Sequence, residues 1–320
     1  MQRHLQNPIL TRSDIPAIDS QLVDVSSVFN PGATRYRDQI LLLLRVQSRG
    51  RETFLLPASG PDGITFKVWP ELFKLPEFTG IGSRIYHVYD ARITAFDDCY
   101  IITVAIDTDD GCRIGLLRTT DFRSVDYIGI PFDEDSRNAV LFPEKINGRF
   151  HMLYRPNRTN LDGGVASGSA IELATSADLK TWHSEGPVME GRFHYWDELI
   201  GSGPPPIKTR RGWLHIYHGV ATHFAASNIY QAGVILLDLE QPRRVIGRSR
   251  GNILEPRELY EMVGQVPNVV FPSGLIHVEP DSDGFVAGDS KLLVYYGAAD
   301  TSVCLATTTV NALLEACDEV

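Results

Sequence analysis

The sequence of 320 residues predicts an all-β fold, a five-bladed β-propeller that ends in a short C-terminal helix. Two observations predict it. A polar or glycine residue that opens a strand-like run recurs five times along the chain, at steps of roughly 50 to 65 residues, a spacing typical of repeat architectures. Short apolar runs, rich in branched and aromatic residues and separated by turn signals, follow each of these positions. Five units of about four strands each make a five-bladed propeller.

The recurring positions open the first strand of each unit. They are Asn30, Asp90, Asn138, Gly203 and Asn268. Asp90 is the one carboxylate among them. An acid that opens a strand points into an end or a channel more often than into a packed face, so Asp90 is the first candidate for chemistry.

The second and third strands of each unit are the apolar runs. The second strands are predicted at 40–44, 100–104, 150–154, 213–217 and 292–296. The third strands are predicted at 54–56, 114–117, 171–174, 232–236 and 303–306. The one plausible helix spans 310–317. Because no linker or low-complexity segment interrupts the pattern, residues 1–320 are predicted to form a single five-bladed β-propeller domain.

Composition narrows the classes of function and location. A hydrophobic content of 43% supports a substantial core, and a net charge of −10 argues against nucleic acid or an anionic membrane as a partner. No apolar run has the length of a membrane span, and the first residues lack the apolar core of a signal peptide. The four scattered cysteines are read as free thiols, which predicts a cytoplasmic protein. The nine histidines lack metal-ligand spacing, so no metal is expected.

Polar residues follow the second strands and predict a site. They are Arg45, Arg155, His218 and Asp300. In a propeller the ends of the inner strands surround the mouth of the central channel, so these residues are expected to converge with Asp90, Arg137, Asn138 and Lys208. A group of guanidinium ions beside one carboxylate suits an oxyanion such as phosphate.

Each of these residues also has a more ordinary interpretation. A single arginine at a strand end is often a surface ion-pair partner, and Lys208 after a proline run fits a solvated loop charge. His218 fits a core histidine, and Asp90 or Asp300 fits a carboxylate that caps a turn. Their joint recurrence at equivalent positions favours a site.

Five motifs, in order along the chain, resemble family 130 of the glycoside hydrolases. They are Tyr89-Asp90-Ala91-Arg92, residues 137–143, Tyr154-Arg155-Pro156, residues 203–209 with 212–215, and residues 299–301 with 306–310. The resemblance extends from residue 7 to the final helix. It implies a five-bladed propeller and, for most members, β-mannoside phosphorylase activity. The tyrosine before the acid is similar to the 4-O-β-D-mannosyl-D-glucose phosphorylase group, whereas many other members carry Glu-Asp-Pro-Arg.

The resemblance also implies a role for each matching residue. Asp90 falls on the catalytic acid, and Arg137, Asn138, Arg155, Lys208 and His218 fall on the phosphate-binding set. Asp300 falls on the mannose-binding aspartate, with Asn30 and Arg45 as further candidates at the same subsite. The implied reaction is inverting phosphorolysis of β-mannosides, such as β-1,4-mannosyl-glucose, to α-D-mannose 1-phosphate and a free acceptor sugar. Inorganic phosphate is then a co-substrate and no cofactor is needed. The partners are a small oligosaccharide and phosphate, and a homo-oligomer is compatible with the sequence.

The chemistry fits a phosphorylase because the sequence offers one acid and no convincing second carboxylate opposite it. An inverting hydrolase needs that second group to activate water, whereas phosphate is already an anionic nucleophile. The aromatic loop 194–197 offers Tyr195 and Trp196 for stacking on the acceptor sugar; an ordinary blade-connecting loop is the alternative. Two other functions stay open, a β-mannoside hydrolase on the same fold and a non-catalytic mannoside-binding propeller. The acceptor (glucose, N-acetylglucosamine or mannose) also stays open.

Overall fold

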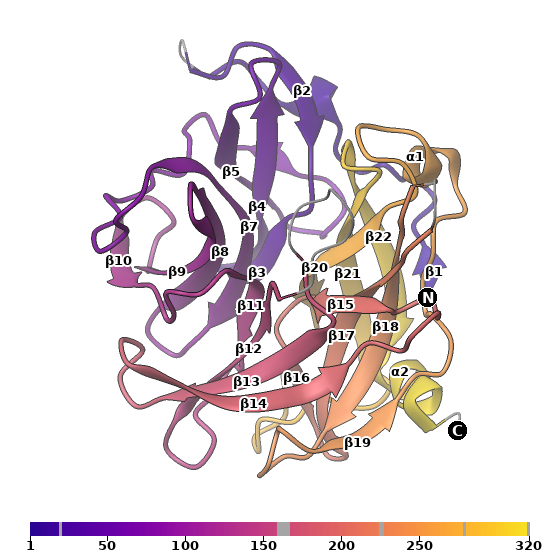
Figure 1. Cartoon of the computed structure of the whole chain (residues 1–320). Helices are drawn as coiled ribbons and strands as arrows, with labels where there is room; N and C mark the ends of the chain where they lie inside the picture. Colours follow the sequence, from indigo (N-terminus) through magenta and orange to yellow (C-terminus); the bar gives the residue numbers. More distant parts are fainter. Residues whose placement is uncertain (19–20, 159–166, 224–226, 278–279, 319–320) are drawn as a thin grey trace.

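Five antiparallel sheets surround a central axis in the computed structural model, which describes residues 1–18, 21–158, 167–223, 227–277 and 280–318 (Figure 1). The first blade contains β2 (Val25–Val28), β3 (Gly32–Tyr36), β4 (Gln39–Ser48), β5 (Thr53–Gly60) and β6 (Lys67–Val68). The second contains β7 (Ile85–Ala95), β8 (Tyr100–Thr108), β9 (Gly111–Thr119) and β10 (Val125–Gly129). The third contains β11 (Ser136–Leu141), β12 (Phe150–Pro156), β13 (Ala170–Ser176) and β14 (Trp182–Glu190). The predicted five-bladed propeller is therefore confirmed.

The last two blades complete the ring. The fourth contains β15 (Leu199–Ser202), β16 (Ile207–Thr209), β17 (Gly212–Ala221), β18 (Ile229–Leu237) and β19 (Val245–Arg248). The fifth contains β20 (Val270–Ile276), β21 (Lys291–Ala298) and β22 (Ser302–Thr309), and its outer strand is β1 (Gln2–Arg3). Arg3 Nε donates to Glu261 Oε1 at 2.8 Å, so a buried carboxylate holds β1 in place. The two ends of the chain thus close one sheet.

Apolar clusters fill the spaces between neighbouring blades. In β4, Leu41 and Leu43 pack toward the second blade, while Leu42 and Leu44 pack toward the fifth. A strand alternates its side chains between two faces, and both faces of this sheet are covered. The unbroken run of leucines is therefore what a blade between two others requires.

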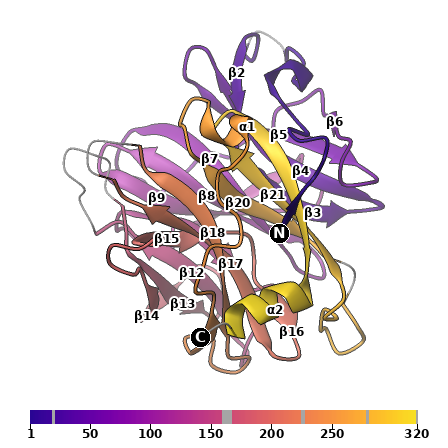
Figure 2. The ribbon, with the colours of Figure 1, turned by 90° about the vertical axis from the view of Figure 1, so that its right-hand side faces the viewer.

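Two short helices and one single turn accompany the sheets. The helix α2 (Val310–Asp318), which faces the viewer in Figure 2, confirms the predicted C-terminal helix. It packs on β18, β19 and β22. The helix α1 (Leu259–Met262) and the 3₁₀ turn η1 (Arg12–Asp14) were not predicted, since neither is long enough to show a helical period. None of the described helices has the length and apolar character needed to cross a membrane. All four cysteines are free and buried.

The first strand of every blade is interrupted near its middle, and these interruptions position the site. In β7 the register shifts between Tyr89 and Arg92, and in β11 between Arg137 and Val140. Asp90 and Asn138 take positive φ angles of 53° and 54° there. This left-handed conformation is several-fold enriched in Asp and Asn. The backbone leaves the ladder at these points, so both polar side chains can turn into the channel.

The recurring positions predicted from the sequence need two corrections. Asp90 and Asn138 lie within their strands, at bulges, and do not open them. Asn268 precedes β20, whereas the register of that strand shifts between Pro272 and Gly274. Asn30 and Gly203 fall in the gaps between β2 and β3 and between β15 and β16.

Candidate active site

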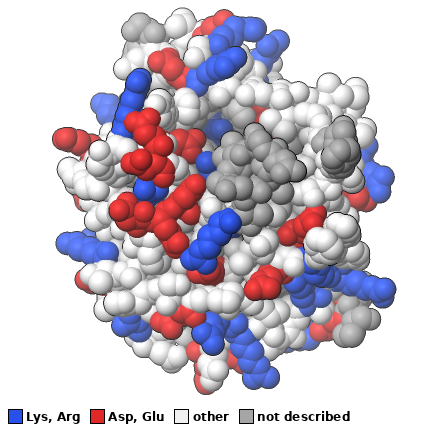
Figure 3. Space-filling model, viewed as in Figure 1, with Lys and Arg blue, Asp and Glu red and all other residues white. Residues whose placement is uncertain are grey.

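A pocket of about 260 Å³ lies at one end of the channel and takes lining residues from all five blades. The described residues that line it are Asn30, Arg45, Tyr89, Asp90, Arg137, Asn138, Arg155, His218, Tyr230, Val266, Val269, Phe271 and Asp300. Eight of the eleven residues predicted for the site therefore meet, although they lie far apart in the sequence. Figure 3 shows this face of the molecule, with acidic side chains gathered to the left of its centre.

Asp90 is held between two arginines. Arg45 Nη1 donates to Asp90 Oδ1 at 3.0 Å. The Arg45 guanidinium lies 4.3 Å from the ring centroids of both Phe29 and Tyr89, so two aromatic faces fix its plane. Arg92, which is fully buried, donates from Nη1 to the Asp90 carbonyl at 2.9 Å. Arg45 thus orients the carboxylate of Asp90, and Arg92 holds the backbone of the same residue.

The charges around Asp90 set its protonation state. Burial alone would raise the pKa of this carboxyl, but the charges of Arg45 and Arg92 outweigh burial and lower it below the ordinary value. Asp90 is therefore ionised at neutral pH in these surroundings. Asp300 behaves differently: burial, with a contribution from the charge of Asp90, raises the pKa of Asp300 to about 6 against the opposing charge of Arg45.

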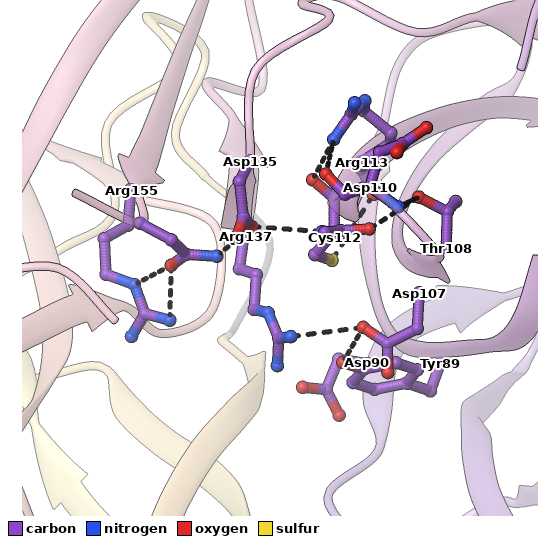
Figure 4. A network of polar contacts seen from close by, with 12 residues as sticks. Tyr89, Asp90, Asp107, Thr108, Asp110, Cys112, Arg113, Asp135, Arg137 and Arg155 are labelled. Atoms are coloured by element: carbon purple, nitrogen blue, oxygen red, sulfur yellow. Dashed lines mark hydrogen bonds and ion pairs between the residues drawn. The ribbon is translucent and has the colours of Figure 1, made fainter. Parts of the chain in front are cut away.

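Arg137 is anchored by a carboxylate from the second blade, as Figure 4 shows. Its Nη2 donates to Asp107 Oδ1 at 3.1 Å, and the Tyr89 hydroxyl donates to the same oxygen at 2.9 Å. Burial would lower the pKa of Arg137, but the neighbouring Tyr89, Cys112 and Asp107 raise it overall. Arg137 therefore keeps its charge beside the pocket.

Arg155 is anchored without a carboxylate of its own. Its Nε and Nη2 donate to Asn157 Oδ1 at 3.2 and 3.0 Å, and Asn157 Nδ2 donates to Asp135 Oδ1 at 2.6 Å (Figure 4). Among the described residues, no carboxylate forms an ion pair with Arg155, which is 7% exposed. Burial, followed by the charge of Arg137, lowers the pKa of Arg155 to about 10. A buried cation held this way is well placed to bind an anion.

Several buried polar atoms of the pocket have no partner in the described part of the chain. They are Arg45 Nε, Arg137 Nε, Asn138 Oδ1 and both ring nitrogens of His218. Buried polar groups in folded proteins are nearly always hydrogen-bonded, so these atoms indicate a polar ligand. Burial, with the charges of Arg155 and Arg92, holds the pKa of His218 well below its ordinary value, which leaves a neutral ring able to donate one hydrogen bond.

The structure does not bring Lys208 to this pocket. Lys208 lies in β16, beyond the gap at residues 203–206, and its Nζ donates to Glu144 Oε1 at 2.7 Å. Its ammonium also lies 4.9 Å from the ring centroid of Phe285. The prediction that Lys208 joins the cationic set is corrected, because the inner strand resumes toward the other end of the channel after its three prolines.

Tyr195 and Trp196 are also outside the pocket. Trp196 stacks on Tyr217 with ring centroids 5.8 Å apart, and its Nε1 donates to the Arg250 carbonyl at 3.0 Å. The next residue, Asp197, is fully buried and accepts from Tyr217 Oη at 2.8 Å and from Arg248 Nη2 at 2.6 Å. The loop is therefore a connection held on the fourth blade, and Trp196 is not placed at the pocket. Stacking of the exposed Tyr195 on a sugar stays a prediction.

Sequence reasoning missed several lining residues, among them Tyr230, Phe271 and Tyr89. Tyr230 lies in β18, which begins at Ile229, three residues before the apolar run from which the strand was predicted. Strand ends are hard to place from sequence, since polar residues at a channel mouth break the apolar pattern. For Tyr89 the sequence did contain a signal of a place in the pocket, because this residue directly precedes Asp90. In the described part of the chain, no group of three or more His, Cys, Asp or Glu could hold a metal ion.

Comparison with known proteins identifies the family of this chain. The family model for glycoside hydrolase family 130, described as beta-1,4-mannooligosaccharide phosphorylase, matches residues 1–319. The chain belongs to glycoside hydrolase family 130. The resemblance seen in the motifs is thereby confirmed, and so, at the level of the family, is the prediction of an enzyme of the glycoside phosphorylase type.

Similar proteins within family 130 are named for different β-mannoside substrates. The beta-1,4-mannooligosaccharide phosphorylase of Ruminococcus albus is 31% identical over 320 residues, covering 98% of this chain and 89% of the relative. The 4-O-beta-D-mannosyl-D-glucose phosphorylase of Bacteroides fragilis is 31% identical over 314 residues, covering 92% of this chain and 76% of the relative. A solved structure of the beta-1,2-mannobiose phosphorylase of Listeria innocua is 28% identical, with a TM-score of 0.84 and 99% of each chain covered.

Proposed function

We propose that this member of family 130 catalyses the inverting phosphorolysis of β-mannosides and yields α-D-mannose 1-phosphate and a shortened acceptor. The substrate proposed is a β-1,4-mannosyl disaccharide or oligosaccharide, in line with the family description and with two of the relatives. The proposal includes inorganic phosphate as co-substrate, no cofactor, and residues 1–320 as one catalytic domain. The cytoplasmic location stays a prediction.

One observation carries the proposal: the two sides of the pocket differ in charge. The third and fourth blades contribute Arg137, Asn138, Arg155, His218 and Tyr230, none of which is an acid. The two carboxylates of the described lining, Asp90 and Asp300, belong to the second and fifth blades. An inverting hydrolase needs a carboxylate on the far side of the sugar from its acid to activate water. The cationic side offers a binding place for an anionic nucleophile instead.

In this proposal Arg137 and Arg155 hold the phosphate and orient it toward the anomeric carbon. Positioning and charge neutralisation are what such a nucleophile needs. Asn138 and His218 would supply further hydrogen bonds. Asp300, Asn30 and Arg45 would hold the mannosyl unit, and Tyr230 lies where its hydroxyl could reach either ligand.

Asp90 is proposed as the general acid that gives its proton to the glycosidic oxygen. The charges of Arg45 and Arg92 outweigh burial and lower the pKa of Asp90, so the proton must be acquired as the substrates bind. The negative charge of bound phosphate offsets the arginines and raises the pKa of Asp90, and exclusion of water by the sugar acts in the same direction. Phosphate binding thus prepares the acid as well as supplying the nucleophile.

The experiment that tests the proposal compares β-1,4-mannobiose, β-1,4-mannosyl-glucose and β-1,2-mannobiose, each with and without inorganic phosphate. Phosphorus NMR and sugar chromatography would follow the products. The expected result is α-mannose 1-phosphate, formed only when phosphate is present and fastest from a β-1,4 substrate. Free mannose formed at the same rate without phosphate would establish a hydrolase. Calorimetric binding of mannosides without turnover in either condition would favour a binding protein.

A further inference from the structure

A second hollow, of about 610 Å³, lies beside the pocket and has no role in the chemistry above. Its described lining is Ser26, Gln47, Ser48, Arg49, Arg51 and Gln265. Every one of these side chains is polar. We refer to it as the polar groove.

The polar groove continues from the pocket along two segments. In β4, Arg45 lines the pocket and Gln47 lines the groove, and residues two apart in a strand share one face. Before β20, Val266 lines the pocket and its neighbour Gln265 lines the groove. A ligand that leaves the pocket between these segments therefore enters the groove.

Gln265 connects the two blades that form the polar groove. Its Nε2 donates to Gln47 Oε1 at 2.9 Å, and its Oε1 accepts from Ser27 Oγ at 3.0 Å. Its backbone nitrogen donates to Thr301 Oγ1 at 2.9 Å, next to Asp300. These contacts leave Gln47 Nε2 without a partner among the described residues. The Arg51 guanidinium is likewise free of any described partner, and Arg49 is paired with Asp24 at 2.9 Å.

The position of the polar groove matches the direction in which the acceptor must leave. In an inverting displacement the nucleophile and the leaving group lie on opposite faces of the sugar ring. The proposed phosphate site belongs to the third and fourth blades, and the groove belongs to the first and fifth. An acceptor sugar on the far side of the mannosyl unit from phosphate therefore points toward the groove.

We propose that the polar groove binds the part of a neutral oligosaccharide acceptor beyond its first sugar unit, so that the enzyme prefers chains longer than a disaccharide. This inference rests on the proposed function. Amide and guanidinium donors such as Gln47 Nε2 and the Arg51 side chain suit sugar hydroxyl groups. Pairing with Asp24 offsets the charge of Arg49, so Arg51 is the arginine of the described groove lining that is left to bind a ligand.

The test measures kcat/KM for mannobiose and mannotriose of both the β-1,4 and the β-1,2 series, at saturating phosphate. The wild-type enzyme should favour the triose of its preferred series by several-fold. Gln47→Ala and Arg51→Ala should each lower the triose-to-biose ratio by roughly two- to tenfold, the effect of about one lost hydrogen bond. Arg211→Ala removes an exposed arginine paired with Asp318, away from the groove, and should leave the ratio unchanged. Synthesis from mannose 1-phosphate should show the same preference for mannobiose over mannose as acceptor.

The outcomes separate this inference from the proposed function. Phosphorolysis with a wild-type ratio near one, or with a ratio that neither groove variant changes, would overturn the inference and leave the function standing. Absence of mannose 1-phosphate from every substrate would overturn the proposed function itself. Gln47→Ala breaks the contact to Gln265 and could unfold the loop, so Arg51→Ala, whose side chain is exposed and unpaired among the described residues, keeps the test decisive.

Discussion

Replacing Arg155 by methionine should make the unliganded protein more stable and its response to phosphate weaker. Arg155 is buried, and within the described chain it lacks a carboxylate partner. Its pKa falls to about 10, more than two pH units below the ordinary value, so the folded state disfavours the charge by about 3 kcal/mol. Because a cation with a lowered pKa is charged at every pH below that pKa, this penalty is constant across the neutral range.

The net gain in stability follows from what methionine keeps and loses. It keeps most of the volume and removes the buried charge, but it breaks the contact to Asn157, which costs about 1 kcal/mol. A net gain of about 1–2 kcal/mol should raise Tm by roughly 1 to 3 °C in a chain of this length. Loss of a charge-assisted contact to phosphate, of about 1.5–3 kcal/mol, should raise the KM for phosphate roughly tenfold to more than a hundredfold. The KM for the mannoside should change less.

Differential scanning fluorimetry in phosphate-free buffer, repeated with increasing phosphate, measures both effects, and steady-state kinetics measures the two KM values. Arg155→Lys should restore phosphate binding only in part, because an ammonium lacks the planar fork of a guanidinium. Arg118→Met is the matched control, since Arg118 is exposed and pairs with Asp98 at 3.2 Å on the second blade. A variant Arg155→Met with lower Tm and an undiminished phosphate response would refute the reasoning. A changed KM for the mannoside alone would place Arg155 at the sugar instead.

Three further changes test other parts of the site. Asp90→Asn should lower kcat by a factor near the upper end of roughly 10² to 10⁴, measured on a disaccharide with circular dichroism as the control of folding; near-normal kcat would mean that another group is the acid. Asp107→Asn weakens the hydrogen bond that holds Arg137, so it should raise the KM for phosphate roughly two- to tenfold while kcat changes little. An unchanged KM for phosphate would contradict a positioning role for Asp107. Asp300 has a pKa raised to about 6, so the folded state loses stability as pH rises from about 4 to 6, and the loss persists above pH 6. The variant Asp300→Asn should therefore have a higher Tm than the wild type at pH 7 but not at pH 4. Equal Tm differences at both pH values would argue against the raised pKa.

The sequence predicted the structure best where a single physical requirement, such as burial of a strand on both faces, determined the order of apolar and polar residues. Second strands such as Leu41–Leu44 are buried on both faces, so they read as unbroken apolar runs whatever else the blade contains. The polar residues that follow them, such as Arg45 and His218, could be assigned to the channel mouth because closure of the ring brings equivalent positions together. The fold and most of the pocket follow from these two regularities.

The remaining errors arose where side-chain direction depends on irregular backbone. Lys208 follows a proline-rich gap, and the side of the channel that it reaches is set by where the strand resumes. Trp196 looked like a sugar platform, but its neighbour Asp197 ties the loop to Tyr217 and Arg248, contacts that no local pattern reveals. Tyr230 was not predicted because it lies near the start of its strand, before the apolar run.

The pairing of β1 with β22 has a consequence for how the enzyme is made. Residues 2 and 3 are synthesised before the first blade, whereas their partners at 306 and 307 are synthesised after the other four blades. The strand β1 therefore has no partner until β22 has been synthesised, and contacts between such distant segments form slowly. Because the fifth blade contributes Phe271 and Asp300 to the pocket, a nascent chain with four finished blades has an incomplete site. Activity should therefore arise in one step, when the ring closes after synthesis.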